Sequence, residues 1–229
     1  MNLQWVRERF DGDPAEYDAG LERFIPHYAV QNEMFLAFVP FQQSENFRLL
    51  QVGAGTGVLP HLVLEHFPNS SAHVVDMTEE SLAVARRRLA AYGDRVTYQA
   101  GHLGVEDLGG GANVVFSDLA LHHLGTAAKR AVYRRIYESL TLSGMFLNRD
   151  LVYGATETLT WHYERLWRLY LQAQGQDDVG LLDRSHAEDT PASVDDQLEW
   201  LRSIGFVDVG CHWRFLNFAI FGGQKGFRH

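Results

Sequence analysis

Short apolar runs and amphipathic segments alternate along the middle of the chain, between residues 48 and 151. Runs rich in valine, leucine and phenylalanine that end at glycine, proline or polar residues predict strands. Apolar residues that recur at helical spacing between those runs predict helices. The expected strands lie at 48–52, 72–75, 96–99, 113–116 and 145–151, and the expected helices lie at 56–67, 79–92 and 126–140. This order is typical of a parallel sheet covered by helices.

The segments on either side of this alternation have a different character. Residues 1–47 are rich in aromatic side chains and predict helices, and a second aromatic helix is expected at 158–171. Alternating residues at 207–213 and 215–221 predict a terminal antiparallel hairpin.

Three residues mark the expected helix starts. Thr78 and Thr126 are predicted N-caps, and Ser193 with Asp196 three positions later resembles a capping box for a last helix that ends at Ile204. We therefore expect one domain over residues 1–229. Its parts are a ligand-binding core at 48–151, a closing helix and hairpin at 192–229, and a helical lid formed by 1–47 and 153–190.

Three glycines follow the first expected strand at every second position: Gly53, Gly55 and Gly57. Such a loop exposes backbone N–H groups, and the next helix directs its positive end toward a ligand that binds there. The dinucleotide-binding pattern G-x-G-x-x-G needs its third glycine at position 58, where this chain has Val58. No Lys-Ser/Thr pair follows the loop, which excludes a P-loop.

Asp76 ends the second expected strand, 21 positions beyond Gly55. A carboxylate at this place can accept hydrogen bonds from both hydroxyl groups of a ribose held over the glycine loop. The two features together predict an adenosine site, whichever cofactor carries the adenosine.

Composition narrows the class of protein. A net charge of −9 argues against a large nucleic-acid interface, which needs clustered lysine and arginine. Cys211 is the one cysteine, so no disulfide can form within the chain, and a reducing compartment is expected. The longest apolar run, 34–41, contains Pro40 and is too short to span a bilayer. We expect a cytoplasmic protein that acts apart from membranes.

The region around the fourth expected strand carries a family resemblance. The glycine loop, the segment Val114–Leu124 and the segment Leu140–Asp150 are similar, in this order, to motifs of class I S-adenosylmethionine-dependent methyltransferases. The resemblance covers residues 45 to 222. It implies an α/β fold with a Rossmann-like, doubly wound, seven-stranded mixed sheet, a terminal antiparallel hairpin and a helical lid. It also implies S-adenosylmethionine as cofactor and methyl transfer to an oxygen, nitrogen or carbon atom of a small molecule.

The same resemblance implies the cofactor contacts. Asp118 falls where the family contacts the methionine end, and Met77 falls where an apolar side chain covers the adenine. His102 stands where many members have an aspartate for the adenine amino group, and a neutral imidazole accepts one hydrogen bond at most. The implied cofactor residues are Gly53, Ala54, Gly55, Gly57, Asp76, Met77, His102, Leu103 and Asp118.

His122 is the candidate general base. A His at this position works with an N-terminal tyrosine in phosphoethanolamine-type methyltransferases, so by analogy Tyr17 or Tyr28 is its expected partner. A base is required only if the acceptor atom carries a proton. His27 and Asp150 are weaker candidates. No third ligand of suitable spacing accompanies the histidine pair at 122 and 123, so no metal site is expected.

Two other functions stay open. The closing region, from Ser193-Val194-Asp195 through Phe215-Leu216-Asn217-Phe218, resembles carboxy-S-adenosylmethionine synthases of tRNA modification. Such enzymes need an arginine for the extra carboxylate just before this helix, and that place falls near Thr190, where this chain has no arginine. A non-catalytic adenosine-binding scaffold is the other alternative. The identity of the acceptor and the oligomeric state cannot be read from the chain, and a dimer is possible.

Overall fold

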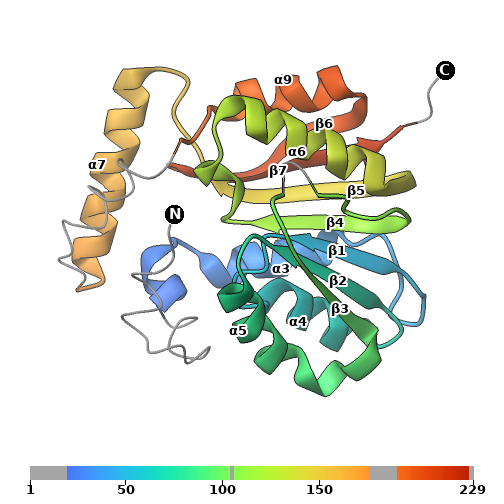
Figure 1. Ribbon diagram of the computed structural model, residues 1–229. Helices are drawn as coiled ribbons and strands as arrows, with labels where there is room; N and C mark the ends of the chain where they lie inside the picture. The colour runs from blue at the N-terminus through green and yellow to red at the C-terminus, as the bar shows by residue number, and fades with distance from the viewer. Residues whose placement is uncertain (1–19, 104–105, 176–189, 227–229) are drawn as a thin grey trace.

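A computed structural model describes residues 20–103, 106–175 and 190–226. Within these residues the chain forms a mixed sheet of seven strands in the order β3-β2-β1-β4-β5-β7-β6 (Figure 1). The strands are β1 (Arg48–Val52), β2 (Ser71–Asp76), β3 (Val96–Ala100), β4 (Ala112–Asp118), β5 (Leu140–Leu151), β6 (Phe206–Phe215) and β7 (Phe218–Lys225). The expected Rossmann-like sheet with its terminal hairpin is confirmed.

The strand order explains where a ligand can bind. Strands β1 to β5 are parallel, and β7 joins β5 antiparallel before it pairs with β6. The chain moves outward from β1 to β3 and then returns to place β4 on the other side of β1. In open α/β sheets, ligands bind at the carboxyl ends of the strands where the order reverses, which here is between β1 and β4.

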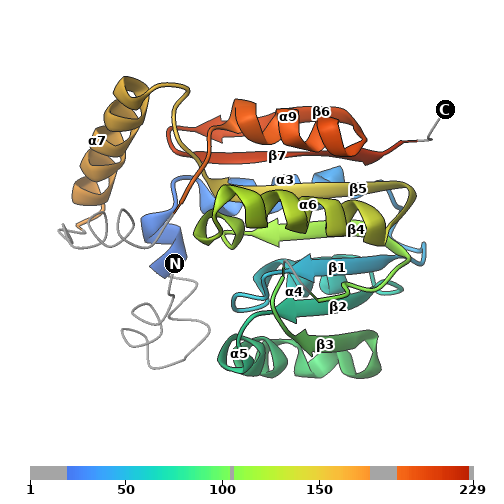
Figure 2. The same ribbon diagram turned by 45° about the horizontal axis from the view of Figure 1, so that its top comes forward.

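Helices cover both faces of this sheet, as Figure 2 shows for α6 and α9 in front of the strands and α3 behind them. The helices are α3 (Tyr28–Phe38), α4 (Val58–His66), α5 (Glu79–Leu89), α6 (Thr126–Ser139), α7 (Glu157–Ala173) and α9 (Val194–Ile204), with 3₁₀ turns at Ala90–Arg95 and Leu121–His123. Strand β1 is therefore covered on both sides, which accounts for the burial of every residue from Leu49 to Val52.

Two core clusters fill the space between the sheet and its helices. Leu50, Val115 and Phe146 pack with α6 and α9 on one face. The neighbouring residues along the same strands, such as Leu49 and Leu147, pack with α3, α4 and α5 on the other face. Successive side chains of a strand point to opposite faces, so one sheet serves two cores.

A third cluster joins distant segments beside the sheet. Phe24 and Tyr28 of the N-terminal region pack with Trp167 of α7 and Phe218 of β7. The indole nitrogen of Trp167 donates a hydrogen bond to the carbonyl oxygen of Phe24, 2.9 Å away. The described part of the N-terminal region thus holds α7 against the body of the protein.

Several expected boundaries hold. Strand β1 has the predicted bounds, Thr78 accepts a hydrogen bond from the backbone nitrogen of Ser81, and Ser193 accepts one from the backbone nitrogen of Asp196. The last helix ends at Ile204 as expected.

Other boundaries were wrong. Thr126 is the first residue of α6, because Gly125 takes the extended N-cap conformation and no side chain caps this helix. The helix expected over 79–92 stops at Leu89 and continues as a 3₁₀ turn. Strand β5 begins at Leu140, and residues 141–144 form an irregularity before its regular pairing with β4 resumes at Met145.

The hairpin turn lies further along the chain than predicted. Leu216 takes a positive φ of 52° between β6 and β7, so β7 begins at Phe218 instead of Phe215. No helix within the described residues has the length and apolar character that crossing a membrane requires.

Gly222 offers a test of the close packing between β7 and β5. A Cβ atom at this position would lie 1.9 Å from the carbonyl oxygen of Phe146. We expect Gly222→Ala to lower the free energy of unfolding by about 3 kcal/mol, because the two backbones would have to separate. Gly110→Ala is the control, since a Cβ there has no neighbouring heavy atom within 4 Å. Urea denaturation measures both, and equal stability of the two variants would contradict this packing argument.

Candidate active site

The glycine loop after β1 has the conformation that only glycine adopts readily. Gly53, Gly55 and Gly57 all have positive φ angles, of 83°, 49° and 78°. A Cβ at Gly53 would lie 2.3 Å from the Cβ of Ala120, and a Cβ at Gly57 would touch Ala85 of α5 at 3.4 Å. At Gly55 no heavy atom lies within 4 Å. Gly53 and Gly57 therefore allow close packing within the protein, whereas Gly55 borders space in which a ligand could approach the backbone.

Asp76 fixes this loop relative to α5. Its Oδ2 accepts a hydrogen bond from the backbone nitrogen of Ala54 at 2.8 Å, and its Oδ1 accepts one from the backbone nitrogen of Thr78 at 3.0 Å. A carboxylate has about four acceptor sites, so these backbone contacts orient Asp76 and leave capacity for a ligand. Asp76 therefore lies at the carboxyl end of β2, directly beside the glycine loop.

The residues expected around the adenine differ in exposure. Met77 is 47 % exposed, His102 is exposed, and Leu103 is buried in the core cluster that contains Val75. Met77 therefore keeps an accessible side chain, whereas Leu103 is committed mainly to the protein interior. The carbonyl oxygen of His102 accepts a hydrogen bond from the backbone nitrogen of Glu106 at 2.9 Å.

Asp118, at the carboxyl end of β4, forms an ion pair that sequence reasoning missed. Arg149 of β5 donates to both of its carboxylate oxygens, with Nε–Oδ1 and Nη2–Oδ2 distances of 2.6 and 2.7 Å. The side chain of Arg149 is fully buried. Burial alone would lower the pKa of Arg149, but the charge of Asp118 and the neighbouring Tyr28 raise it above its usual value. The pair puts a buried cation directly behind the carboxyl end of β4.

Tyr28 belongs to this ion pair. Its ring lies over the guanidinium of Arg149, 4.3 Å from ring centre to Cζ. The structure therefore brings Tyr28 to Arg149 instead of to His122, the partner expected for it. Tyr17 lies outside the described residues. His27 stacks edge-on against Phe215, with ring centres 4.9 Å apart.

His122 has a different partner, Asp150. Its Nδ1 is hydrogen bonded to Oδ1 of Asp150, and both side chains are almost completely buried. The backbone nitrogen of Leu151 donates to the same Oδ1 at 3.1 Å, and the amide of Asn148 donates to Oδ2 at 3.3 Å. The carboxylate of Asp150 is thus held by donors on both oxygens.

The two pairs are separated by the geometry of β5. Arg149 and Asp150 are successive residues of one strand, so their side chains point to opposite faces of the sheet. Arg149 lies on the face of α3 with Leu147, and Asp150 lies on the face of α6 and α9 with Phe146. This alternation explains why Tyr28 and His122 are not partners.

A buried polar network continues from Asp150 toward α9. The hydroxyl group of Tyr133 donates to Oε1 of Gln197 at 2.5 Å, and the amide of Gln197 donates to the carbonyl oxygen of Ala192. Burial raises the pKa of Tyr133 well above its usual value, and the negative charge of Asp150 raises it further. Tyr133 therefore stays a neutral hydrogen-bond donor.

The segment before α9 is tied to the turn that carries His122. The backbone nitrogen of Thr190 donates to the carbonyl oxygen of His122 at 2.8 Å, and its hydroxyl group donates to that of Leu124 at 2.7 Å. The buried ammonium group of Lys129 donates to the carbonyl oxygens of Leu124 and Thr190. Thr190 thus has a structural role at the place considered for a carboxylate-binding arginine.

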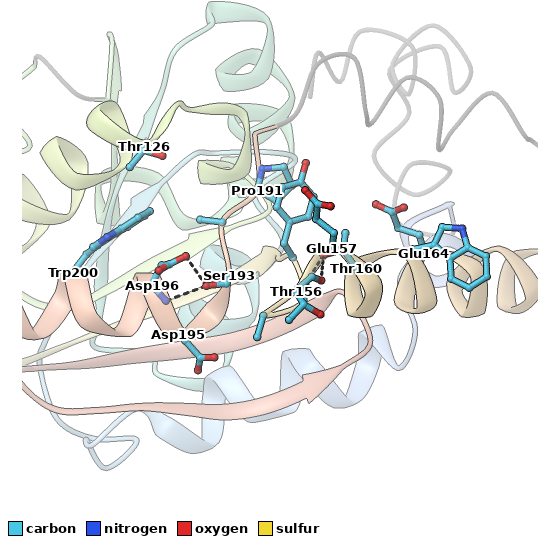
Figure 3. Close-up of a pocket in the computed structure, with 15 residues that line it drawn as sticks. Thr126, Thr156, Glu157, Thr160, Glu164, Pro191, Ser193, Asp195, Asp196 and Trp200 are labelled. Carbon is cyan, nitrogen blue, oxygen red and sulfur yellow. Dashed lines mark hydrogen bonds between the residues drawn. The ribbon is translucent and has the colours of Figure 1, made fainter.

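A cavity of about 680 Å³ opens beyond this segment. Figure 3 shows it between the N-terminus of α7, the residues around Pro191 and the first turns of α9. Its walls include Trp161, Trp200 and the carboxylates of Glu157, Glu164 and Asp195. None of the expected cofactor residues lines it. Within the described residues, no group of three or more His, Cys, Asp or Glu side chains is arranged to hold a metal ion.

Comparison with protein families gives one match in the sheet region. Residues 50–146 match the model of the Methyltransf_12 family, described as a methyltransferase domain. This region includes the glycine loop, Asp76, Asp118 and His122.

Curated relatives match over nearly the whole chain at low identity. The carboxy-S-adenosyl-L-methionine synthase of Campylobacter hominis is 20 % identical over 96 % of this chain and 96 % of its own length. That of Wolinella succinogenes is 24 % identical, over 92 % of this chain and 90 % of its own. The malonyl-[acyl-carrier protein] O-methyltransferase of Bacillus cereus is 23 % identical, over 64 % of this chain and 52 % of its own.

Solved structures share the fold. An O-methyltransferase family protein from Burkholderia thailandensis aligns with a TM-score of 0.67 at 17 % identity, over 96 % of this chain and 63 % of its own. A phosphoethanolamine N-methyltransferase from Haemonchus contortus, in complex with S-adenosylhomocysteine, aligns with a TM-score of 0.58 at 22 % identity, over 80 % of this chain and 38 % of its own. This chain thus spans less than two thirds of either structure.

These findings agree with the geometry at the sheet edge. The matched model describes a methyltransferase domain, the curated relatives are named as carboxy-S-adenosyl-L-methionine synthases and O-methyltransferases, and one solved structure of the same fold contains S-adenosylhomocysteine. Residues 50–146 therefore match a methyltransferase domain, and the chain has the fold of class I S-adenosylmethionine-dependent methyltransferases. Together with the curated relatives, these findings indicate an S-adenosylmethionine-dependent enzyme.

Proposed function

We propose that this enzyme transfers the methyl group of S-adenosylmethionine to an oxygen, nitrogen or carbon atom of a small molecule, and that the attacked atom carries a proton. The observation that supports this proposal is the buried pair of His122 and Asp150. His122 lies four residues beyond Asp118 along the chain. A methyltransferase needs a base of this kind only when its acceptor must lose a proton.

Asp150 determines how His122 would act. With Nδ1–H donated to the carboxylate, Nε2 is the nitrogen that takes the proton, and the negative charge of Asp150 stabilises the imidazolium that results. The hydrogen bonds from Leu151 and Asn148 hold Asp150 in place. Because His122 is only 1 % exposed, the acceptor has to meet it inside the closed site, away from water.

The residues of the glycine loop fit the cofactor. Bound S-adenosylmethionine supplies a methyl carbon that its sulfonium activates toward in-line attack. We assign Asp76 to the ribose hydroxyls, Met77 to one face of the adenine and Asp118 to the methionine end. The open side of Gly55 lets the cofactor approach the backbone closely. We also assign His102 and Leu103 to the adenine, with Leu103 contributing from the buried cluster that contains Val75.

A carboxy-S-adenosylmethionine synthase is the second candidate. Its support is that the relatives with this name match over nearly the whole length of both chains. The position of Thr190 argues against it, because its hydroxyl group and backbone nitrogen are used by the His122 turn. Mass spectrometry of the nucleoside that co-purifies with the protein separates the two: a donor heavier by one carboxyl group would overturn the methyltransferase proposal.

The proposal extends to the cellular location of the enzyme and to its partner. With a net charge of −9 and one cysteine, we place it in the cytoplasm, with a small-molecule acceptor as its partner.

Asp76→Ala tests the cofactor assignment. We expect its affinity for S-adenosylhomocysteine to fall by roughly 10- to 100-fold, since hydrogen bonds to a charged group contribute about 1.5–3 kcal/mol. Asp76→Asn keeps one acceptor oxygen and should lose less. Glu80→Ala, at an exposed position of α5, is the control. Isothermal titration calorimetry gives the affinities, and an Asp76→Ala variant that binds like the wild type would refute the ribose role.

Asp150→Asn tests the base. An amide in place of the carboxylate can donate to Nδ1, which moves the imidazole proton to Nε2 and removes the base. We expect kcat to fall by roughly 10²- to 10⁴-fold while affinity for S-adenosylhomocysteine stays near that of the wild type.

The measurement is the release of S-adenosylhomocysteine with phenol, amine and carbon-acid acceptors. Asp208→Asn, at an exposed position on β6, is the matched control. Folding of each variant is checked by circular dichroism. An Asp150→Asn enzyme that stays folded and turns over at the wild-type rate would exclude His122 as the base.

A further inference from the structure

Arg149 contacts two parts of the molecule that are distant in sequence. On one side it binds both carboxylate oxygens of Asp118, at the carboxyl end of β4. On the other side its Nη1 donates to Oδ1 of Asn32 in α3, at 2.8 Å, and its guanidinium lies under the ring of Tyr28. A single buried side chain therefore joins the carboxyl end of β4 to helix α3.

The burial of Arg149 makes each of these contacts costly to lose. Its side chain is fully buried, so water cannot replace a missing partner. A buried cation is stable only when its charge is paired and its N–H groups are satisfied. Within the described residues, Asp118 supplies the charge, and Asn32 supplies the acceptor on the α3 side. The position of α3 and the position of Asp118 are thus set by the same guanidinium.

Arg149 also controls the loop that follows Asp118. The backbone nitrogen of Leu119 donates to the carbonyl oxygen of Arg149 at 2.8 Å, and Leu119 has a positive φ of 48°. The next residue, Ala120, lies directly over Gly53 of the glycine loop. A shift of Arg149 would therefore move both the acidic residue at the end of β4 and the wall of the glycine loop.

On the other side, the contacts of α3 extend to α7. Tyr28 shares a buried cluster with Phe24 and Trp167, and Trp167 donates its indole N–H to the carbonyl oxygen of Phe24. The N-terminal region that contacts Arg149 is thus the same region that holds α7 beside the sheet.

We propose that Arg149 is a positioning residue that couples cofactor binding to the docking of α3. A cofactor that binds Asp118 stabilises the arrangement of Arg149 in which Asn32 and Tyr28 also fit, and docked α3 in turn strengthens cofactor binding, because coupling between two sites is reciprocal. This inference rests on the proposed contact between Asp118 and the methionine end of the cofactor.

Asn32→Ala is the decisive variant, since it removes the acceptor that Asn32 of α3 offers to Arg149 and leaves Tyr28, Asp118, Arg149 and the glycine loop unchanged. We expect its affinity for S-adenosylhomocysteine to fall by about fivefold or more, the lower end of usual coupling between sites. Asn32→Asp keeps an oxygen at the same place and should restore the affinity. Glu33→Ala, at the next and exposed position of α3, is the control.

Two measurements on the full chain distinguish coupling from a merely structural contact. Calorimetry gives the affinity for S-adenosylhomocysteine, and hydrogen exchange follows the amides of α3 with and without it. In the wild type, binding should slow exchange in α3, and in Asn32→Ala this protection should shrink along with the affinity.

The remaining outcomes overturn the proposal in recognisable ways. If Asn32→Ala exchanges faster in α3 but binds S-adenosylhomocysteine like the wild type, the contact is structural only. If Glu33→Ala weakens binding as much as Asn32→Ala, general helix stability is the cause. If the wild type itself does not bind S-adenosylhomocysteine, the cofactor roles assigned above fall together with this inference. Wild-type binding with unchanged Asn32→Ala affinity removes the coupling alone.

Discussion

The ion pair between Arg149 and Asp118 is the constraint on which the arrangement of the site depends. A guanidinium with no exposure to solvent needs an opposite charge and further acceptors within reach. The sheet provides the charge by aligning β4 and β5 so that Asp118 and Arg149 are register partners. Helix α3 provides an acceptor and an aromatic ring. Strands β4 and β5 and helix α3 must therefore all be in place before the buried charge of Arg149 is stabilised.

Successive side chains of β5 point to opposite faces of the sheet, so Arg149 and Asp150 make their contacts on different faces. Arg149 lies on the face covered by α3 and binds Asp118 at the end of β4. Asp150 lies on the face covered by α6 and α9 and orients His122. Both side chains emerge near the carboxyl ends of β4 and β5, beside the point where the strand order reverses. A fold of this kind places ligands at that edge. Under the proposed function, Arg149 would support the cofactor and His122 would act as base at this edge, from opposite faces of the sheet.

Local signals were sufficient for much of this structure. The run at 48–52, the caps at Thr78 and Ser193, and the place of Asp76 at the end of β2 all follow from short stretches of sequence. Each depends on periodicity or on a side chain that bonds to its own neighbourhood. The seven-stranded order came from family resemblance as much as from the strands themselves.

The pairings inside the site had no such local signal. Arg149 finds Asp118 and Asn32 across 31 and 117 positions of the chain, and His122 finds Asp150 across 28. An arginine within the apolar run at 145–151 was the clue available, since a charge in a buried strand demands a partner. Which tyrosine would meet which residue depends on the face that α3 turns to the sheet, and this was not predictable from spacing. The start of β5 at Leu140 likewise depends on its pairing with Ala112.

The cluster that joins Phe24 and Tyr28 to Leu151, Trp167 and Phe218 has a consequence for the order of folding. The partners of these N-terminal residues lie more than a hundred positions later in the chain, the last of them on β7. During synthesis Phe24 and Tyr28 leave the ribosome well before these partners exist. Their burial completes only after the closing hairpin has formed, because contacts of such long sequence separation carry a high loop-closure entropy. This cluster, which contains some of the earliest of the described residues, is therefore among the last to be consolidated.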